Sequence, residues 1–147
     1  EKMQLTGVKF FTEKQVDGIT CGSGVMGEVP GAMAADDFIM MLKREFDVEC
    51  VQCNQLLRRP IRTVAICGGA GSFLLPEAIA AGADAFVTGE MHYHDYFAHE
   101  QEIQIAVIGH YQSEQYTYEI FKSIIEEQCE GVRCVVTSQN TNPIIYL

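Results

Sequence analysis

The sequence predicts an α/β fold in which a mostly parallel sheet carries helices on both faces. Short apolar runs that end on or near glycine, at residues 62–69, 85–89 and 103–109, alternate with helical patterns. This order is typical of parallel strands joined by crossover helices. The runs are apolar throughout, as expected for strands covered on both faces. With 147 residues, of which 48% are hydrophobic, the chain can bury one core and is expected to form one compact domain.

The N-terminal part has the least regular pattern. Residues 8–11 (VKFF) are predicted to form a strand, whereas the glycine-rich residues 21–31 (CGSGVMGEVPG) are predicted to form a loop. The first helix is expected within residues 33–48, because apolar side chains recur there at helical spacing. These side chains are Phe38, Met41, Leu42 and Phe46.

The later elements continue the alternation of strands and helices. Residues 72–84 are predicted to form a helix that ends near Gly82, and residues 91–101 a short helix. Residues 132–138 (VRCVVTS) are expected to be a last strand. A longer helix is predicted over residues 111–128, with one apolar stripe. The stripe consists of Tyr116, Ile120, Phe121 and Ile124.

Charge and composition exclude several classes of function. The 20 acidic residues outnumber the 10 Lys and Arg residues, and the net charge of -10 repels nucleic-acid phosphates, so nucleic-acid binding is not expected. Neither a signal-peptide pattern nor an apolar run of about eighteen residues occurs, so we expect a cytoplasmic protein without membrane partners. The six cysteines lack a disulfide framework and are predicted to be reduced. A redox function of the lone pair Cys50 and Cys53 is a distant alternative.

Chemically useful residues directly follow three of the predicted strands. Because the carboxyl ends of parallel strands meet at one edge of a sheet, these residues are expected to converge. They are Gly68, Gly69 and Gly71, then Thr88, Gly89 and Glu90, and finally His110.

His110 and Glu114 are candidate metal ligands. If a helix starts just after the strand at 103–109, their i to i+4 spacing places imidazole and carboxylate on one helix face. A nitrogen and an oxygen donor suit zinc, manganese or iron. The alternative is a pair on a solvated helix face, where this spacing is common.

Glu90 is a candidate for acid/base chemistry or for orienting a water, since it directly follows a strand end. The alternative is a negative charge favoured by the dipole of the next helix. His92 and His94 lie on one side if their segment is extended and are separated if it is helical, so they are pocket residues or surface residues. The turn CGGAGS at 67–72 either lets backbone N–H groups approach an anion or is a tight turn without the Lys-Ser/Thr of a P-loop.

Four stretches occur in a characteristic order: GSGVMGEVPGAM, VAICGGAGSFLLPEAIAAGADAFVTGEMHYHD, IGHYQSE and NTNPIIYL. Together they resemble the C-terminal part of the Nif-three-like dinuclear-metal proteins, the type 2 GTP cyclohydrolase I homologues. The resemblance covers about residues 22–147 and implies one half of a two-lobed fold. Residues 22–147 are then expected to be a C-terminal α/β domain, and residues 1–21 a linker or the end of an inserted domain.

The resemblance also implies a site. The family's Gly-His-x-x-x-Glu motif supplies two ligands to a divalent metal pair of zinc, manganese or iron, and here it falls on His110 and Glu114. Glu90 is implied as a catalytic residue near the metals. The residues implied to line the pocket are Thr88, Gly89, His92, His94, Gly68, Gly69 and Gly71.

The implied activity is that of a metal-dependent hydrolase of the GTP cyclohydrolase or nucleotide and phosphoester class. Its ligand would be a small phosphorylated compound or nucleotide, and its subunits would form a hexameric ring. The family's other metal ligands come from an N-terminal half, but residues 1–84 contain no histidine. This chain is therefore expected to be a C-terminal fragment that needs the missing half as a partner, binds metal weakly or not at all, and is inactive alone. The alternative is a non-catalytic metal-binding or ring-forming scaffold.

Overall fold

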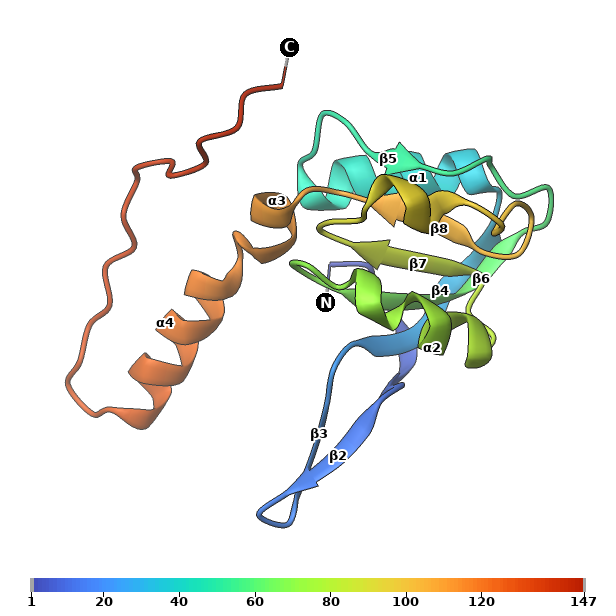
Figure 1. Cartoon of the computed structure of the whole chain (residues 1–147). Helices are drawn as coiled ribbons and strands as arrows, with labels where there is room; N and C mark the ends of the chain where they lie inside the picture. Colours follow the sequence, from blue (N-terminus) through green and yellow to red (C-terminus); the bar gives the residue numbers. More distant parts are fainter. Residues whose placement is uncertain (1, 147) are drawn as a thin grey trace.

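A computed structural model describes residues 2–146 and is built around a six-stranded sheet (Figure 1). The residues Glu1 and Leu147, which belong to the expected ranges 1–21 and 22–147, lie outside the described part. In spatial order the strands are β1 (Thr6–Phe10), β4 (Val25–Met33), β6 (Ile61–Cys67), β7 (Ala85–Thr88), β8 (Gln104–Val107) and β5 (Gln52–Cys53).

The sheet is mixed. β6 pairs parallel with β7, and β7 with β8, whereas β1–β4, β4–β6 and β5–β8 are antiparallel. The α/β class is confirmed, but the parallel order expected for most of the sheet holds only for its central strands. The physical reason is connectivity, because only these strands follow one another through crossovers, whereas β1 and β4 are joined by a hairpin and run antiparallel.

β4 corrects the prediction of a loop at residues 21–31. The strand lies between β1 and β6, and its side chains Met26 and Val29 are buried. Gly27 is needed for close packing rather than for a turn, since a Cβ atom there would lie 2.9 Å from the carbonyl oxygen of Thr6. The remaining irregularity is a register shift between Glu28 and Met33. Of the glycines in β4, Gly27 therefore marks close packing and Gly31 lies in the irregular stretch of the strand.

Helices cover both faces of the sheet, as predicted (Figure 1). α1 (Ala35–Phe46) buries Phe38 and Leu42 against one face, in a cluster that includes Val87. The 3-10 helix η1 (Ser72–Leu74) and α2 (Leu75–Ala80) cover the other face, in a cluster that includes Phe86. Neighbouring strand residues point to opposite faces, and each such buried side chain stabilises the fold by about 1.5–3 kcal/mol. Among residues 2–146, none of the helices combines the length and apolar character that crossing a bilayer requires.

The C-terminal part differs from the prediction. Instead of one helix over residues 111–128, the chain forms α3 (His110–Glu114) and α4 (Thr117–Gln128), and α4 buries none of its residues. The prediction of a strand at residues 132–138 is wrong, because this segment has no regular structure. A strand needs a neighbour to pair with, and Figure 1 shows the segment beside α4, away from the sheet.

A hairpin of β2 (Glu13–Val16) and β3 (Ile19–Gly22) connects β1 to β4 and projects from the sheet (Figure 1). The strand predicted at 8–11 is confirmed by β1, with a shift of its bounds. The boundary expected between residues 21 and 22 falls within β3, and the origin of residues 1–21 stays a prediction. The short helix predicted at 91–101 is present as the 3-10 helix η2 (Tyr93–Tyr96).

Asp84 ties the start of β6 to the loop before β7. Its carboxylate accepts hydrogen bonds from the backbone N–H groups of Arg62 and Thr63, both at 2.9 Å, and from the guanidinium of Arg59. Burial raises the pKa of Asp84, but the N–H donors and the charge of Arg59 outweigh burial, and the pKa lies below its ordinary value. The folded state therefore favours the ionised carboxylate.

We expect Asp84→Asn to lower the free energy of unfolding by about 1–3 kcal/mol at neutral pH, since the amide keeps fewer of these bonds. Because the folded-state pKa is depressed, the contribution is present above the unfolded pKa and is lost as the pH falls through the folded pKa. In urea unfolding, the difference in the free energy of unfolding between the wild type and Asp84→Asn should be smaller at about pH 3 than at about pH 7. Asp17→Asn in the exposed hairpin turn is the control, and an Asp84→Asn effect of equal size at both pH values would contradict the assignment.

Candidate functional site

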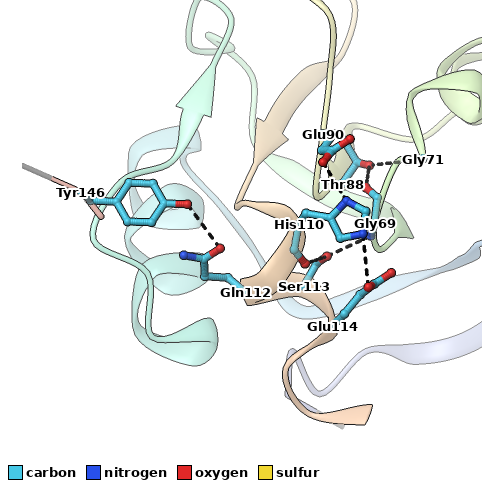
Figure 2. A network of polar contacts seen from close by, with 9 residues as sticks. All are labelled: Gly69, Gly71, Thr88, Glu90, His110, Gln112, Ser113, Glu114 and Tyr146. Atoms are coloured by element: carbon cyan, nitrogen blue, oxygen red, sulfur yellow. Dashed lines mark hydrogen bonds and ion pairs between the residues drawn. The ribbon is translucent and has the colours of Figure 1, made fainter. Parts of the chain in front are cut away.

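The three predicted strand ends meet at one edge of the sheet. In the register of the parallel strands, Cys67 of β6 lies opposite Thr88 of β7, and Thr88 lies opposite Val107 of β8. The segments that follow these residues therefore emerge side by side, and Figure 2 shows their side chains around His110. The convergence expected from the topology is confirmed.

Hydrogen bonds with Thr88 and Gly89 hold the glycine turn after β6 in place. The buried Thr88 hydroxyl accepts from the Gly71 N–H at 3.1 Å and donates to the Gly69 carbonyl at 3.3 Å. The Gly69 carbonyl also accepts from the Gly89 N–H at 3.0 Å. On the other side, the Ser113 hydroxyl accepts from the Gly69 N–H at 2.9 Å and donates to the His110 carbonyl at 2.8 Å. The turn and the start of α3 are thus one connected unit (Figure 2).

His110 lies between two carboxylates. Its Nδ1 is 2.7 Å from Oε1 of Glu90, and its Nε2 is 3.2 Å from Oε2 of Glu114, one helical turn later (Figure 2). All three side chains are about half exposed, at 44% for His110, 58% for Glu90 and 54% for Glu114. The hydrogen bond to Glu90, followed by the charge of Glu114, raises the pKa of His110 above its ordinary value.

The donor atoms of His110 and Glu114 are of the kind that divalent metal ions bind. When the Nδ1–H of a neutral imidazole donates to Glu90, the lone pair on Nε2 is free to bind a cation beside the Glu114 carboxylate. One nitrogen and one oxygen suit a borderline divalent ion. Within residues 2–146, however, no group of three or more His, Cys, Asp or Glu side chains is arranged to hold a metal ion. The pair fits two positions of a coordination sphere and leaves a tetrahedral site unfilled.

A cavity of about 350 Å³, here called the strand-end cavity, adjoins His110. Of the residues predicted at the site, Gly89, Glu90, His92 and His110 line it. The apolar part of its lining includes Met91, Val107, Ile144 and Tyr146, and Cys50, Gln52, Ala70 and Ser72 also contribute.

Other predicted pocket residues have different places. Thr88, Gly68, Gly69 and Gly71 are not in the lining of the strand-end cavity; the hydrogen bonds of Thr88, Gly69 and Gly71 shape its edge instead. Glu114 faces a second cavity beside α4. His94 lines a different hollow with His92, Asp95 and His99, and its ring stacks on that of His92 with the centroids 5.6 Å apart.

Two residues that local sequence reasoning missed are Ile144 and Tyr146. They reach the strand-end cavity from the C-terminal segment, and the Tyr146 hydroxyl donates to Oε1 of Gln112 at 3.4 Å (Figure 2). The only signal for them was the terminal NTNPIIYL stretch, which belongs to the family resemblance and has no local chemistry.

No disulfide joins Cys50 and Cys53 in this structure, and their redox function stays an untested alternative. All six cysteines are free thiols, and Cys50 lines the strand-end cavity whereas Cys53 does not. Burial, and then the neighbouring Cys50, raise the pKa of Cys53 above its ordinary value. A raised pKa disfavours the reactive thiolate.

Comparison with known proteins identifies relatives over most of the chain. The family model of Duf34/NIF3 (NGG1p interacting factor 3) matches residues 1–143. The GTP cyclohydrolase 1 type 2 homolog of Staphylococcus epidermidis is 32% identical over 130 residues, which is 85% of this chain and 35% of the relative. The homolog of Halalkalibacterium halodurans is 28% identical over 135 residues, or 89% and 36% of the two chains. The chain thus spans about a third of the length of these curated relatives.

Two solved structures share the fold. The crystal structure of a hypothetical protein from Staphylococcus aureus matches with a TM-score of 0.85 and 23% identity, over 99% of this chain and 61% of that one. The crystal structure of a Bacillus cereus protein related to NIF3 matches with a TM-score of 0.74 and 27% identity, over 90% and 38% of the two chains.

Proposed function

Because the chain belongs to the Duf34/NIF3 family, we propose that it supplies a histidine and a glutamate ligand to the divalent metal site of a hydrolase. The observation that carries the proposal is the position of the His110 imidazole, with Nδ1 at 2.7 Å from Glu90 and Nε2 at 3.2 Å from Glu114. A carboxylate that accepts the second N–H of a histidine orients the ring for metal binding. Glu90 then positions His110, and Glu114 provides the neighbouring oxygen.

His110, Glu114 and Glu90 have different roles in the proposed chemistry. A bound divalent cation supplies Lewis acidity, which activates water and polarises a phosphoryl group or a ring carbon. His110 and Glu114 hold the cation. Glu90 uses Oε1 for His110, and among the described residues no hydrogen bond reaches its Oε2, which is available to accept a proton. Since the curated relatives are named GTP cyclohydrolase 1 type 2 homologs, the proposed substrates are nucleotides or other phosphoesters.

The remaining metal ligands, in this proposal, come from outside the chain. Two protein donors do not complete a tetrahedral site or hold two ions. The segment that corresponds to the other two thirds of the relatives' length is the proposed source of the missing ligands, and a homo-oligomeric ring in the cytoplasm is the proposed assembly. The chain alone is expected to bind metal weakly and to lack turnover.

A non-catalytic scaffold is the second candidate, and the surface of α4 favours it. Ile120, Phe121, Ile124 and Ile125 are all exposed on this helix. Phe121 and Ile125 line the second cavity, which has a volume of about 1100 Å³ between α4 and the C-terminal segment, whereas Ile120 and Ile124 are not in its lining. Several large apolar side chains exposed on one helix are typical of a place of assembly. In this case the chain is part of a metal-binding or ring-forming protein that catalyses no reaction.

A chimera separates the two candidates. In it, this chain replaces the matching segment of the Staphylococcus epidermidis relative, and turnover of GTP and of p-nitrophenyl phosphate is measured with zinc or manganese. We expect Glu114→Ala to lower turnover about 100-fold, because one metal ligand is lost, while light scattering shows an unchanged assembly. Glu119→Ala on the exposed side of α4 is the matched control. A chimera that assembles and binds metal but turns over neither substrate would support the scaffold instead.

A further inference from the structure

We infer that the strand-end cavity binds an uncharged nitrogen heterocycle, such as a nucleobase or nucleoside, and excludes a phosphate group. This inference rests on the proposed function only in that the cavity adjoins the proposed metal ligand His110. The cavity volume of about 350 Å³ lies in the range of small-molecule sites. Met91, Val107, Ile144 and Tyr146 give it the apolar surface that the faces of a flat ring need.

The polar part of the lining accepts hydrogen bonds and repels anions. Glu90 is its carboxylate, with Oε1 bonded to His110 and Oε2 bonded to no described residue. A ring N–H can therefore donate to Glu90, whereas a phosphate would face a negative charge. The two imidazoles of the lining do not reverse this, because His110 lies between Glu90 and Glu114, and Nδ1 of His92 is 3.3 Å from Asp95.

The usual devices for binding phosphate are used elsewhere or are missing. Among the described residues that line the cavity, none is lysine or arginine. In the neighbouring glycine turn, the Gly69 N–H donates to Ser113 and the Gly71 N–H donates to Thr88. A phosphate-binding turn needs such N–H groups free and pointing at the anion. Neither glycine N–H is therefore free for an anion, and beside the Glu90 carboxylate a phosphate group on the ligand is expected to weaken binding.

The test compares ligands that differ only in phosphate, in the presence of a metal chelator. Guanosine is the probe, because its ring presents two adjacent N–H donors on one edge. In calorimetric titrations, we expect the chain to bind guanosine at least about tenfold more tightly than guanosine 5′-monophosphate, and inorganic phosphate not at all. We expect Glu90→Gln to weaken guanosine binding about tenfold and to reduce the difference between the two ligands.

Glu77→Gln, an exposed glutamate on α2, is the control and should bind guanosine like the wild type. Absence of guanosine binding, or monophosphate binding of equal strength, would overturn the inference. Because these titrations contain no metal, their outcome does not depend on the proposed metal site, which the chimera tests separately.

Discussion

Replacement of His110 with alanine is expected to remove measurable zinc binding from the chain. In the wild type, Nε2 of His110 and the carboxylate of Glu114 lie 3.2 Å apart, and in the proposed site they offer one nitrogen and one oxygen donor to the same ion. The variant leaves the exposed carboxylates of Glu90 and Glu114 without the nitrogen donor between them, and zinc prefers sites that include nitrogen or sulfur donors. We expect an affinity loss of about 100-fold or more, and a smaller loss for Glu90→Gln, which only loosens the orientation of the ring.

Competition with a fluorescent zinc chelator measures this loss, with His99→Ala as the matched control. His99 pairs with Glu102 at 2.7 Å and does not line the strand-end cavity, so its removal should leave zinc affinity unchanged. Unchanged affinity in His110→Ala would place the zinc elsewhere, for example near His92 and His94. Submicromolar affinity in the monomeric wild-type chain would contradict an incomplete site.

The pH dependence of zinc binding has a defined sign. Hydrogen bonding to Glu90 and the charge of Glu114 raise the pKa of His110, so the imidazolium form persists to higher pH than usual. A metal ion must displace that proton. Zinc affinity is therefore expected to rise with pH in the wild type, and the rise should shift to lower pH in Glu90→Gln, which lacks the first cause of the raised pKa.

The position of the site could be predicted because it follows from chain order. Parallel strands separated by helices bring their carboxyl ends together, so Gly69, Gly89 and His110 had to meet, and the spacing of His110 and Glu114 pairs them once a helix begins at residue 110. Which side chains enter the cavity depended on finer geometry. The turn η2 places His92 in the lining and His94 outside it, and no alternation of sequence letters encodes that choice.

The parts that sequence patterns missed are those decided by distant neighbours. Gly27 of β4 is needed because β1 packs closely against it, as the contact with the Thr6 carbonyl oxygen shows. Residues 132–138 have a strand-like pattern, but their apolar side chains find no sheet edge among the described residues. Tyr146 reaches Gln112 only through the path of the C-terminal segment. The local secondary-structure propensity of the sequence does not predict any of these contacts.

Gly89→Ala is expected to destabilise the fold by about 3 kcal/mol, because the added methyl group has no space. A Cβ atom at this position would lie 2.7 Å from the Gly69 carbonyl oxygen, 2.7 Å from Oγ of Ser113 and 3.0 Å from the Gly69 nitrogen. Two of these atoms belong to the backbone of a turn that is fixed by Thr88, so the turn or the loop after β7 has to move. Gly31→Ala in β4 is the matched control, since a Cβ there meets nothing within 4 Å and the backbone is not left-handed.

Urea unfolding of both variants measures the destabilisation. Zinc competition on the folded Gly89→Ala protein tests whether the close packing of Gly89 against the Gly69 turn is needed for zinc affinity. Moving the loop after β7 carries Glu90 away from His110, so the 2.7 Å contact that orients the imidazole is lost while every ligand side chain stays chemically intact. We therefore expect zinc affinity to fall about tenfold, as for other losses of an orienting partner. A stable Gly89→Ala protein with wild-type zinc affinity would mean that the turn yields easily and that His110 and Glu114 do not depend on Glu90 for their geometry.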